Sequence, residues 1–136
     1  MTTKQQVEQI IAYLNERGET ISVAESLTAG GLANALTSAS GSSSVFLGGI
    51  TAYRNEFKQH MLGVDPKIIE EHTVVSEEVA NAMGDGANKT FGSTWAIATT
   101  GAAGPEPLEG HAPGSVWISI RGPINQAIQL NLEGNR

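Results

Sequence analysis

The spacing of apolar residues along the chain predicts helices that alternate with short strands. In residues 3–17, Val7, Ile10, Ile11 and Leu14 recur at helical spacing, and Gly18 follows as a C-terminal cap. Short apolar runs with β-branched residues predict buried strands. The predicted strands are 20–24, 48–54, 94–100 and 115–121, and the predicted helices are 28–38, 55–62, one from 66, and 76–89. Residues 127–132 alternate apolar and polar positions, which is typical of an antiparallel edge strand with one face in water.

This order of elements predicts one α/β domain. Strands that alternate with helices and end in a hairpin favour a single-domain layered sandwich with a mainly parallel sheet, an antiparallel edge hairpin and helices on both faces. The 136 residues suit one hydrophobic core, and no repeat or linker divides the chain. We expect Asn55, Asp65 and Ser76 to act as N-caps of three of the helices.

Composition narrows the classes of function. The net charge is −6 and the eight Lys and Arg residues are scattered, which argues against a nucleic-acid binder. The chain has no run long enough to cross a bilayer and no signal-like start, so we expect no membrane partner and a cytoplasmic location. The absence of cysteine excludes disulfides and cysteine-based metal or redox chemistry. His60, His72 and His111 lie in separate segments without metal-binding spacing, so we expect no metal site.

Candidate chemistry gathers where three predicted strands end. The segments Glu25–Gly31, Tyr53–Lys58 and Thr99–Gly114 each leave the carboxyl end of a strand. Parallel strands present their carboxyl ends at one edge of the sheet, where α/β proteins bind ligands. The polar residues expected to converge there are Ser26, Thr28, Tyr53, Asn55, Lys58 and Thr100.

These residue types suit metal-free nucleophilic catalysis. A serine hydroxyl needs a base, a buried lysine can serve as one, and a tyrosine can relay the proton. Backbone N–H groups at the start of the helix after Thr28, or in residues 101–104, can hold an oxyanion or a phosphate. Structural alternatives stay open: Ser26 or Thr28 as an N-cap, Tyr53 as a strand aromatic, Lys58 as a solvated side chain, and Glu25 as a first-turn carboxylate rather than a catalytic acid.

Several segments together resemble the CinA C-terminal domain family, which includes the stand-alone PncC-type nicotinamide-nucleotide amidohydrolases. The matching segments occur in the family's order, from Ile21 to the end of the chain. They are AESLTAGGLANALT, SGSSSVFLGGITAYRNEFKQHMLGV, HTVVSEEVANAMGDGA, TTGAAGP and PGSVWISI. The resemblance implies one CinA C-terminal-like domain over residues 1–136, with the family's compact α/β sandwich.

The resemblance also implies an activity and roles for residues. The activity is hydrolysis of the carboxamide of nicotinamide mononucleotide to nicotinic acid mononucleotide and ammonia, without metal or cofactor, by a protein that assembles as a homo-oligomer. Ser26 would be the nucleophile, and Tyr53 and Lys58 would activate it. The residues that would bind substrate are Thr28, Gly30, Gly31, Asn55, Thr100, Gly101, Gly104 and Arg136.

The chain departs from the family pattern at three places. His111-Ala112-Pro113 stands where relatives typically have Lys-Pro-Val, Ala29 replaces the first glycine of a T-G-G motif, and the chain stops at Arg136 where relatives continue into a C-terminal helix. The early stop and the altered loop at 111–113 favour a second hypothesis, a non-catalytic pyridine-nucleotide-binding or interaction module, whereas the presence of Ser26, Tyr53 and Lys58 disfavours it. A third hypothesis is an amidase that acts on another small carboxamide.

Overall fold

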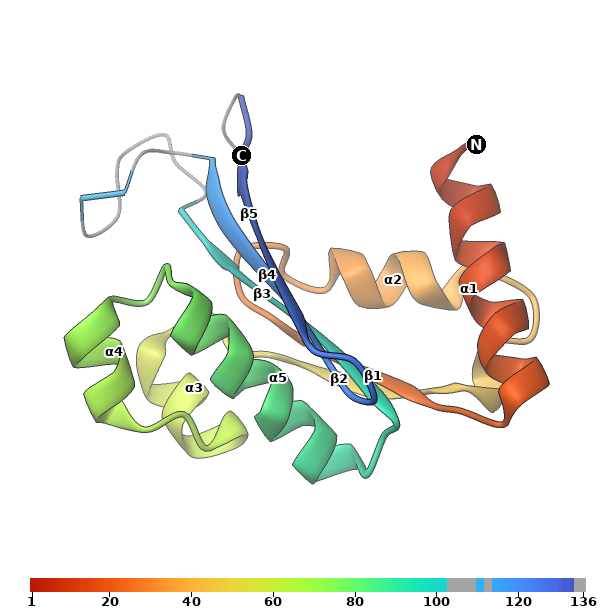
Figure 1. Cartoon of the computed structure of the whole chain (residues 1–136), viewed down its shortest axis with the longest axis horizontal. Helices are drawn as coiled ribbons and strands as arrows, with labels where there is room; N and C mark the ends of the chain where they lie inside the picture. The colour runs from red at the N-terminus through yellow and green to blue at the C-terminus, as the bar shows by residue number, and fades with distance from the viewer. Residues whose placement is uncertain (103–109, 112–113, 134–136) are drawn as a thin grey trace.

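The structure is a computed structural model that describes residues 1–102, 110–111 and 114–133. The described residues form one five-stranded sheet in the order β2-β1-β3-β4-β5, with helices packed against it (Figure 1). The strands are β1 (Ile21–Glu25), β2 (Phe46–Thr51), β3 (Trp95–Gly101), β4 (Ser115–Arg121) and β5 (Gln126–Asn131). The helices are α1 (Thr3–Arg17), α2 (Gly31–Thr37), the single 3-10 turn η1 (Ser42–Ser44), α3 (Asn55–Leu62), α4 (Pro66–His72) and α5 (Glu77–Phe91).

Strand directions match the predicted layered α/β sandwich. β1 lies between β2 and β3 and is parallel to both, whereas β4 and β5 add to β3 as an antiparallel hairpin. Glu25 pairs with Thr51, and Ala24 pairs with Ala98, so β1, β2 and β3 end at the same edge of the sheet. We call this side the carboxyl edge.

One face of the sheet is covered by α5, with α3 and α4 outside it (Figure 1). Val79, Met83 and Ala87 of α5 are fully buried in this core. Gly86 lowers the helix propensity of α5, but a Cβ there would collide with the backbone of Leu62 at the end of α3. The glycine therefore lets the two helices approach closely.

The other face is covered by α1 and α2, which confirms helices on both faces. Val7, Ile11 and Leu14 of α1 are buried against β1, as their spacing predicts, while Ile10 is 40% exposed. Gly18 ends α1 in a left-handed conformation, with φ of 66°.

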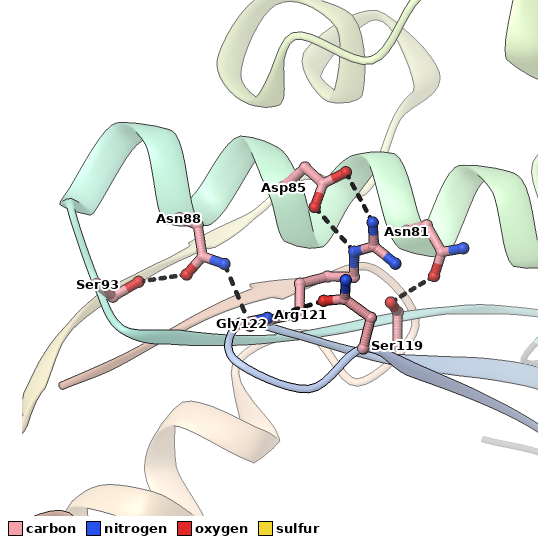
Figure 2. Close-up of polar contacts among 8 residues, drawn as sticks. Asn81, Asp85, Asn88, Ser93, Ser119, Arg121 and Gly122 are labelled. Carbon is pink, nitrogen blue, oxygen red and sulfur yellow. Dashed lines mark hydrogen bonds and ion pairs between the residues drawn. The ribbon is translucent and has the colours of Figure 1, made fainter. Parts of the chain in front are cut away.

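Polar side chains fasten α5 to β4 across the first face (Figure 2). Asn81 Oδ1 accepts a 2.6 Å hydrogen bond from Ser119, and Asp85 accepts one of 2.8 Å from Arg121 Nε. Asn88 donates to the carbonyl of Arg121 at 3.2 Å and accepts from Ser93 at 2.8 Å. These bonds hold the antiparallel hairpin against the same helix that covers the parallel strands.

Some predicted element boundaries are wrong. The second strand spans Phe46–Thr51 rather than 48–54, and α2 begins at Gly31 rather than at residue 28. Asn55 is the first residue of α3 and not its N-cap; Arg54 holds that position without a side-chain cap. Asp65 and Ser76 do cap α4 and α5, since their side chains accept from Lys67 and Val79 N–H groups.

Candidate functional site

Ser26 lies in a tight turn between β1 and α2 at the carboxyl edge. Only 7% of Ser26 is exposed, and its N–H donates to the carbonyl of Thr99 at 3.2 Å, which extends the β1–β3 pairing by one residue. Ala29 N–H then donates to Ser26 O at 3.1 Å, and Gly31 N–H donates to Thr28 O at 2.8 Å. Two consecutive turns thus carry the chain from strand to helix. We call residues 26–31 the Ser26 turn.

The Ser26 turn depends on left-handed backbone conformations. Gly30, with φ of 97°, is the residue before α2, and Ala29 has φ of 49°. Glycine adopts this region without steric cost, whereas alanine does so with strain. The Ala29 that departs from the family pattern therefore occupies a position that favours glycine.

Glu25 supplies the cap of α2. Its Oε1 accepts from Leu32 N–H at 2.8 Å and its Oε2 from Ala33 N–H at 3.0 Å, and the residue is 1% exposed. The alternative that Ser26 or Thr28 is the N-cap is wrong, because α2 has no side-chain cap at Gly30 and Glu25 reaches its amides instead. Glu25 is the last residue of β1 and not part of the first turn of α2, although its carboxylate binds two amides of that turn. The carboxylate therefore already occupies first-turn amides of α2 that could otherwise bind an anionic ligand.

Tyr53 and Lys58 lie together beside the end of β2. Ala52 N–H donates to the carbonyl of Glu25 at 2.9 Å, so the segment that leads to Tyr53 is bonded to the segment that leads to Ser26. Lys58 is 1% exposed, and its Nζ donates to the Tyr53 carbonyl at 3.0 Å. The alternative of a solvated Lys58 is wrong, and Tyr53 follows β2 rather than belonging to it, with half of its surface exposed.

The two threonines at the end of β3 face opposite ways. Thr100 donates its hydroxyl to the carbonyl of Val74 at 2.8 Å, on the side of α5. Thr99 Oγ1 lies 2.8 Å from Thr28 Oγ1, within the Ser26 turn. Thr99 is missing from the residues that the sequence indicates, although the alternation of side chains along a strand could have separated it from Thr100.

The remaining expected site residues are Gly101, Asn55, Gly104 and Arg136. Gly101 allows close packing, because a Cβ there would lie 2.6 Å from Ser115 O and 2.9 Å from Leu27 Cδ1. Asn55 begins α3 and is half-buried. Gly104 and Arg136 lie outside the described residues.

His111 contacts a strained residue near the same edge. Its Nε2 lies 2.9 Å from Thr73 Oγ1, and Thr73 has φ of 66° and ψ of 164°. Non-glycine residues rarely adopt this backbone region. The neighbouring Val74 is the residue that binds Thr100.

The carboxyl edge therefore brings together a buried serine, a buried lysine and a tyrosine, with Thr28 and Thr99 beside the serine. Within residues 1–102, 110–111 and 114–133, no group of three or more His, Cys, Asp or Glu side chains is placed to hold a metal ion. In the same part of the chain, no helix is long and apolar enough to cross a membrane.

The fold and this edge define an α/β domain with a hydroxyl- and lysine-bearing site at the carboxyl ends of its parallel strands. Residues 3–136 match the model of the CinA C-terminal domain, so the chain belongs to this family.

Related sequences agree with the family assignment. A CinA-like protein of Prochlorococcus marinus is 47% identical over 131 residues, which are 95% of this chain and 31% of that protein. A putative competence-damage inducible protein of Pediococcus pentosaceus is 40% identical over 129 residues, or 93% of this chain and 31% of its own length. The chain thus spans about a third of the length of these relatives.

Solved structures with the same fold include the competence damage-inducible protein A of Klebsiella pneumoniae. It superimposes with a TM-score of 0.95 at 28% identity, covering 99% of this chain and 85% of that one. The competence/damage inducible protein of Agrobacterium tumefaciens gives a TM-score of 0.90 at 30% identity, covering 95% and 80%.

Proposed function

We propose that this protein hydrolyses the carboxamide of nicotinamide mononucleotide to nicotinic acid mononucleotide and ammonia. The observation that carries the proposal is the presence of two buried polar residues at one sheet edge: Ser26 lies in a strand–turn–helix connection, and Lys58 lies beside the adjoining strand end. Membership of the CinA C-terminal domain family supports it, since the resemblance described above matches Ser26, Tyr53 and Lys58 to that family's nucleophile and its two activating residues.

The proposed reaction begins with attack by Ser26 Oγ on the carboxamide carbon. Lys58 is the proposed base that accepts the hydroxyl proton, since a lysine at a buried position beside the nucleophile can serve in this role. The C–N bond then breaks, and Tyr53 relays a proton to the departing nitrogen, which leaves as ammonia. Water hydrolyses the resulting acyl–Ser26 ester, which releases nicotinic acid mononucleotide and restores the serine.

Backbone amides in the Ser26 turn are suitable donors for the oxyanion. Glu25 occupies the N–H groups of Leu32 and Ala33. Among the described residues, no acceptor is assigned to the N–H groups of Leu27, Thr28 and Gly30. Amide donors that are already oriented before the substrate reacts are a main source of stabilisation for the oxyanion of a tetrahedral intermediate.

The test is ammonia release from nicotinamide mononucleotide by the whole chain, beside Ser26→Ala and Lys58→Met. Loss of the nucleophile is expected to lower kcat by at least about 10³-fold, since residual catalysis would come from binding and the oxyanion donors alone. Ser43→Ala, an exposed serine in η1, is the matched control and should leave turnover unchanged.

Three results would contradict the proposal. Turnover that persists in Ser26→Ala would contradict the role of Ser26 as the nucleophile. Calorimetric binding of nicotinamide mononucleotide without ammonia release would instead favour a non-catalytic nucleotide-binding module, and turnover of a different carboxamide alone would favour another amidase.

A further inference from the structure

Thr99 contacts the Ser26 turn at two points. Its carbonyl accepts the N–H of Ser26 at 3.2 Å, and its hydroxyl lies 2.8 Å from that of Thr28. The first contact continues the pairing of β1 with β3 and needs no particular side chain. The second is a side-chain contact that links β3 to the middle of the turn.

From this geometry we infer that Thr99 is a positioning residue: its hydroxyl holds Thr28 and thereby fixes the orientation of Ser26 for attack. The inference rests on the proposed function and adds to it a residue outside the serine, tyrosine and lysine set. Thr99 is 4% exposed and acts through Thr28 rather than on the substrate itself.

The turn needs an anchor of this kind. Between Ser26 and Gly31 the backbone makes two internal hydrogen bonds, and Ala29 and Gly30 both have positive φ. Alanine is strained in that region and glycine has many alternatives, so the local sequence does not favour one conformation strongly. A bond from the rigid strand β3 selects one.

Because Thr28 is exposed, loss of its contact with Thr99 is expected to affect the position of the turn more than the stability of the fold. Thr28 is exposed, so its hydroxyl can bind water when the partner hydroxyl is removed. Loss of the Thr99 hydroxyl should therefore release the turn while the rest of the fold stays intact. A displacement of about 1 Å at a nucleophile is enough to lower a rate by about 10²-fold.

The matched control lies at the other end of the same strand pair. Thr94 Oγ1, just before β3, accepts the N–H of Thr20 at 3.0 Å. Thr94→Val removes a threonine hydroxyl between the same two strands, far from the Ser26 turn. Thr99→Ser keeps the hydroxyl at position 99 and serves as the conservative variant.

The experiment compares Thr99→Val, Thr99→Ser and Thr94→Val with the unchanged protein. Hydrogen exchange of the Ala29 and Gly31 amides is measured by NMR, and kcat and KM are measured with nicotinamide mononucleotide. We expect Thr99→Val to speed exchange of both amides by about tenfold or more and to lower kcat by about tenfold or more with a smaller change in KM. Thr99→Ser should restore both quantities, and Thr94→Val should leave both near their original values.

The exchange measurement does not depend on activity, so the two proposals can fail separately. No turnover by the unchanged protein, together with faster exchange in Thr99→Val alone, would overturn the proposed function and support Thr99 as the anchor of the turn. Unchanged exchange in Thr99→Val would overturn the inference. So would an unchanged kcat in Thr99→Val, or equal losses in Thr99→Val and Thr99→Ser.

Discussion

A pair of threonines lies at each end of the β1–β3 pair, but the two pairs differ in how many of their backbone N–H groups are hydrogen-bonded. At the amino end, Thr20 N–H donates to Thr94 Oγ1 and Thr94 N–H donates to Thr20 Oγ1, both at 3.0 Å. At the carboxyl end, Thr28 and Thr99 share one contact between hydroxyls, and no described acceptor is assigned to the Thr28 N–H.

Backbone strain follows the same division. Among the described residues, the non-glycine residues with positive φ are Ala29 and Thr73. Ala29 lies in the Ser26 turn, and Thr73 precedes the residue that binds the end of β3. Gly18 and Gly92, which end the helices before β1 and β3, have positive φ without this cost.

The difference teaches how one pair of strands can serve two purposes. The amino end satisfies its polar groups reciprocally and joins the strands. The carboxyl end has backbone N–H groups without a described acceptor and a strained turn beside a buried serine, which suits the proposed function of this edge. Three substitutions test this contrast, from the largest expected effect to the smallest.

Glu25→Gln should have the largest effect on the free energy of unfolding. The buried carboxylate accepts from two amides of α2, and a glutamine would turn its NH₂ group toward one of them. We expect a loss of about 2–3 kcal/mol in urea unfolding, as for hydrogen bonds to a charged group. Glu8→Gln, on the exposed side of α1, should change stability by less than about 0.5 kcal/mol. Equal unfolding midpoints for Glu25→Gln and the unchanged protein would show that the carboxylate does not hold the turn.

Thr94→Val should weaken the amino end without affecting the site. The Thr20 N–H would lose its acceptor in a half-buried setting, which costs about 1–2 kcal/mol. We expect a lower midpoint in urea unfolding and unchanged kcat, with Thr94→Ser close to the original in both. A fall in kcat for Thr94→Val at temperatures where the variant stays folded would contradict the view that the amino end contributes to stability alone.

The smallest expected effect is the difference between Thr73→Gly and Thr73→Ala, and here the substitution by glycine should raise the free energy of unfolding. Compared with Thr73→Ala, which removes the same hydroxyl contact with His111, glycine also relieves the backbone at φ 66° and ψ 164°. We expect the glycine variant to be more stable than the alanine variant by about 1 kcal/mol in urea unfolding. If alanine were as stable as glycine, Thr73 would not be strained and the contrast in backbone conformation would not hold.

Most of the fold follows from local patterns in the sequence. The buried positions of α1 and the caps Asp65 and Ser76 are where spacing and residue type predict them. The start of α2 is the informative exception, because hydroxyls at Ser26 and Thr28 satisfy the sequence rule for an N-cap while Glu25 makes the bonds. A side chain that reaches seven or eight residues ahead requires a bend of the chain that no local pattern records.

The sequence by itself determined the alternation of strands and helices, because hydrophobic periodicity is a local property. Strands that alternate with helices favour parallel pairing, and parallel pairing places Ser26, Tyr53 and Lys58 at one sheet edge. Only the tertiary structure decided that Lys58 is buried, that Glu25 caps α2, and that Thr99 rather than Thr100 contacts the Ser26 turn. Each of these depends on which atoms meet across elements distant in sequence. Such contacts are set by packing of the whole domain.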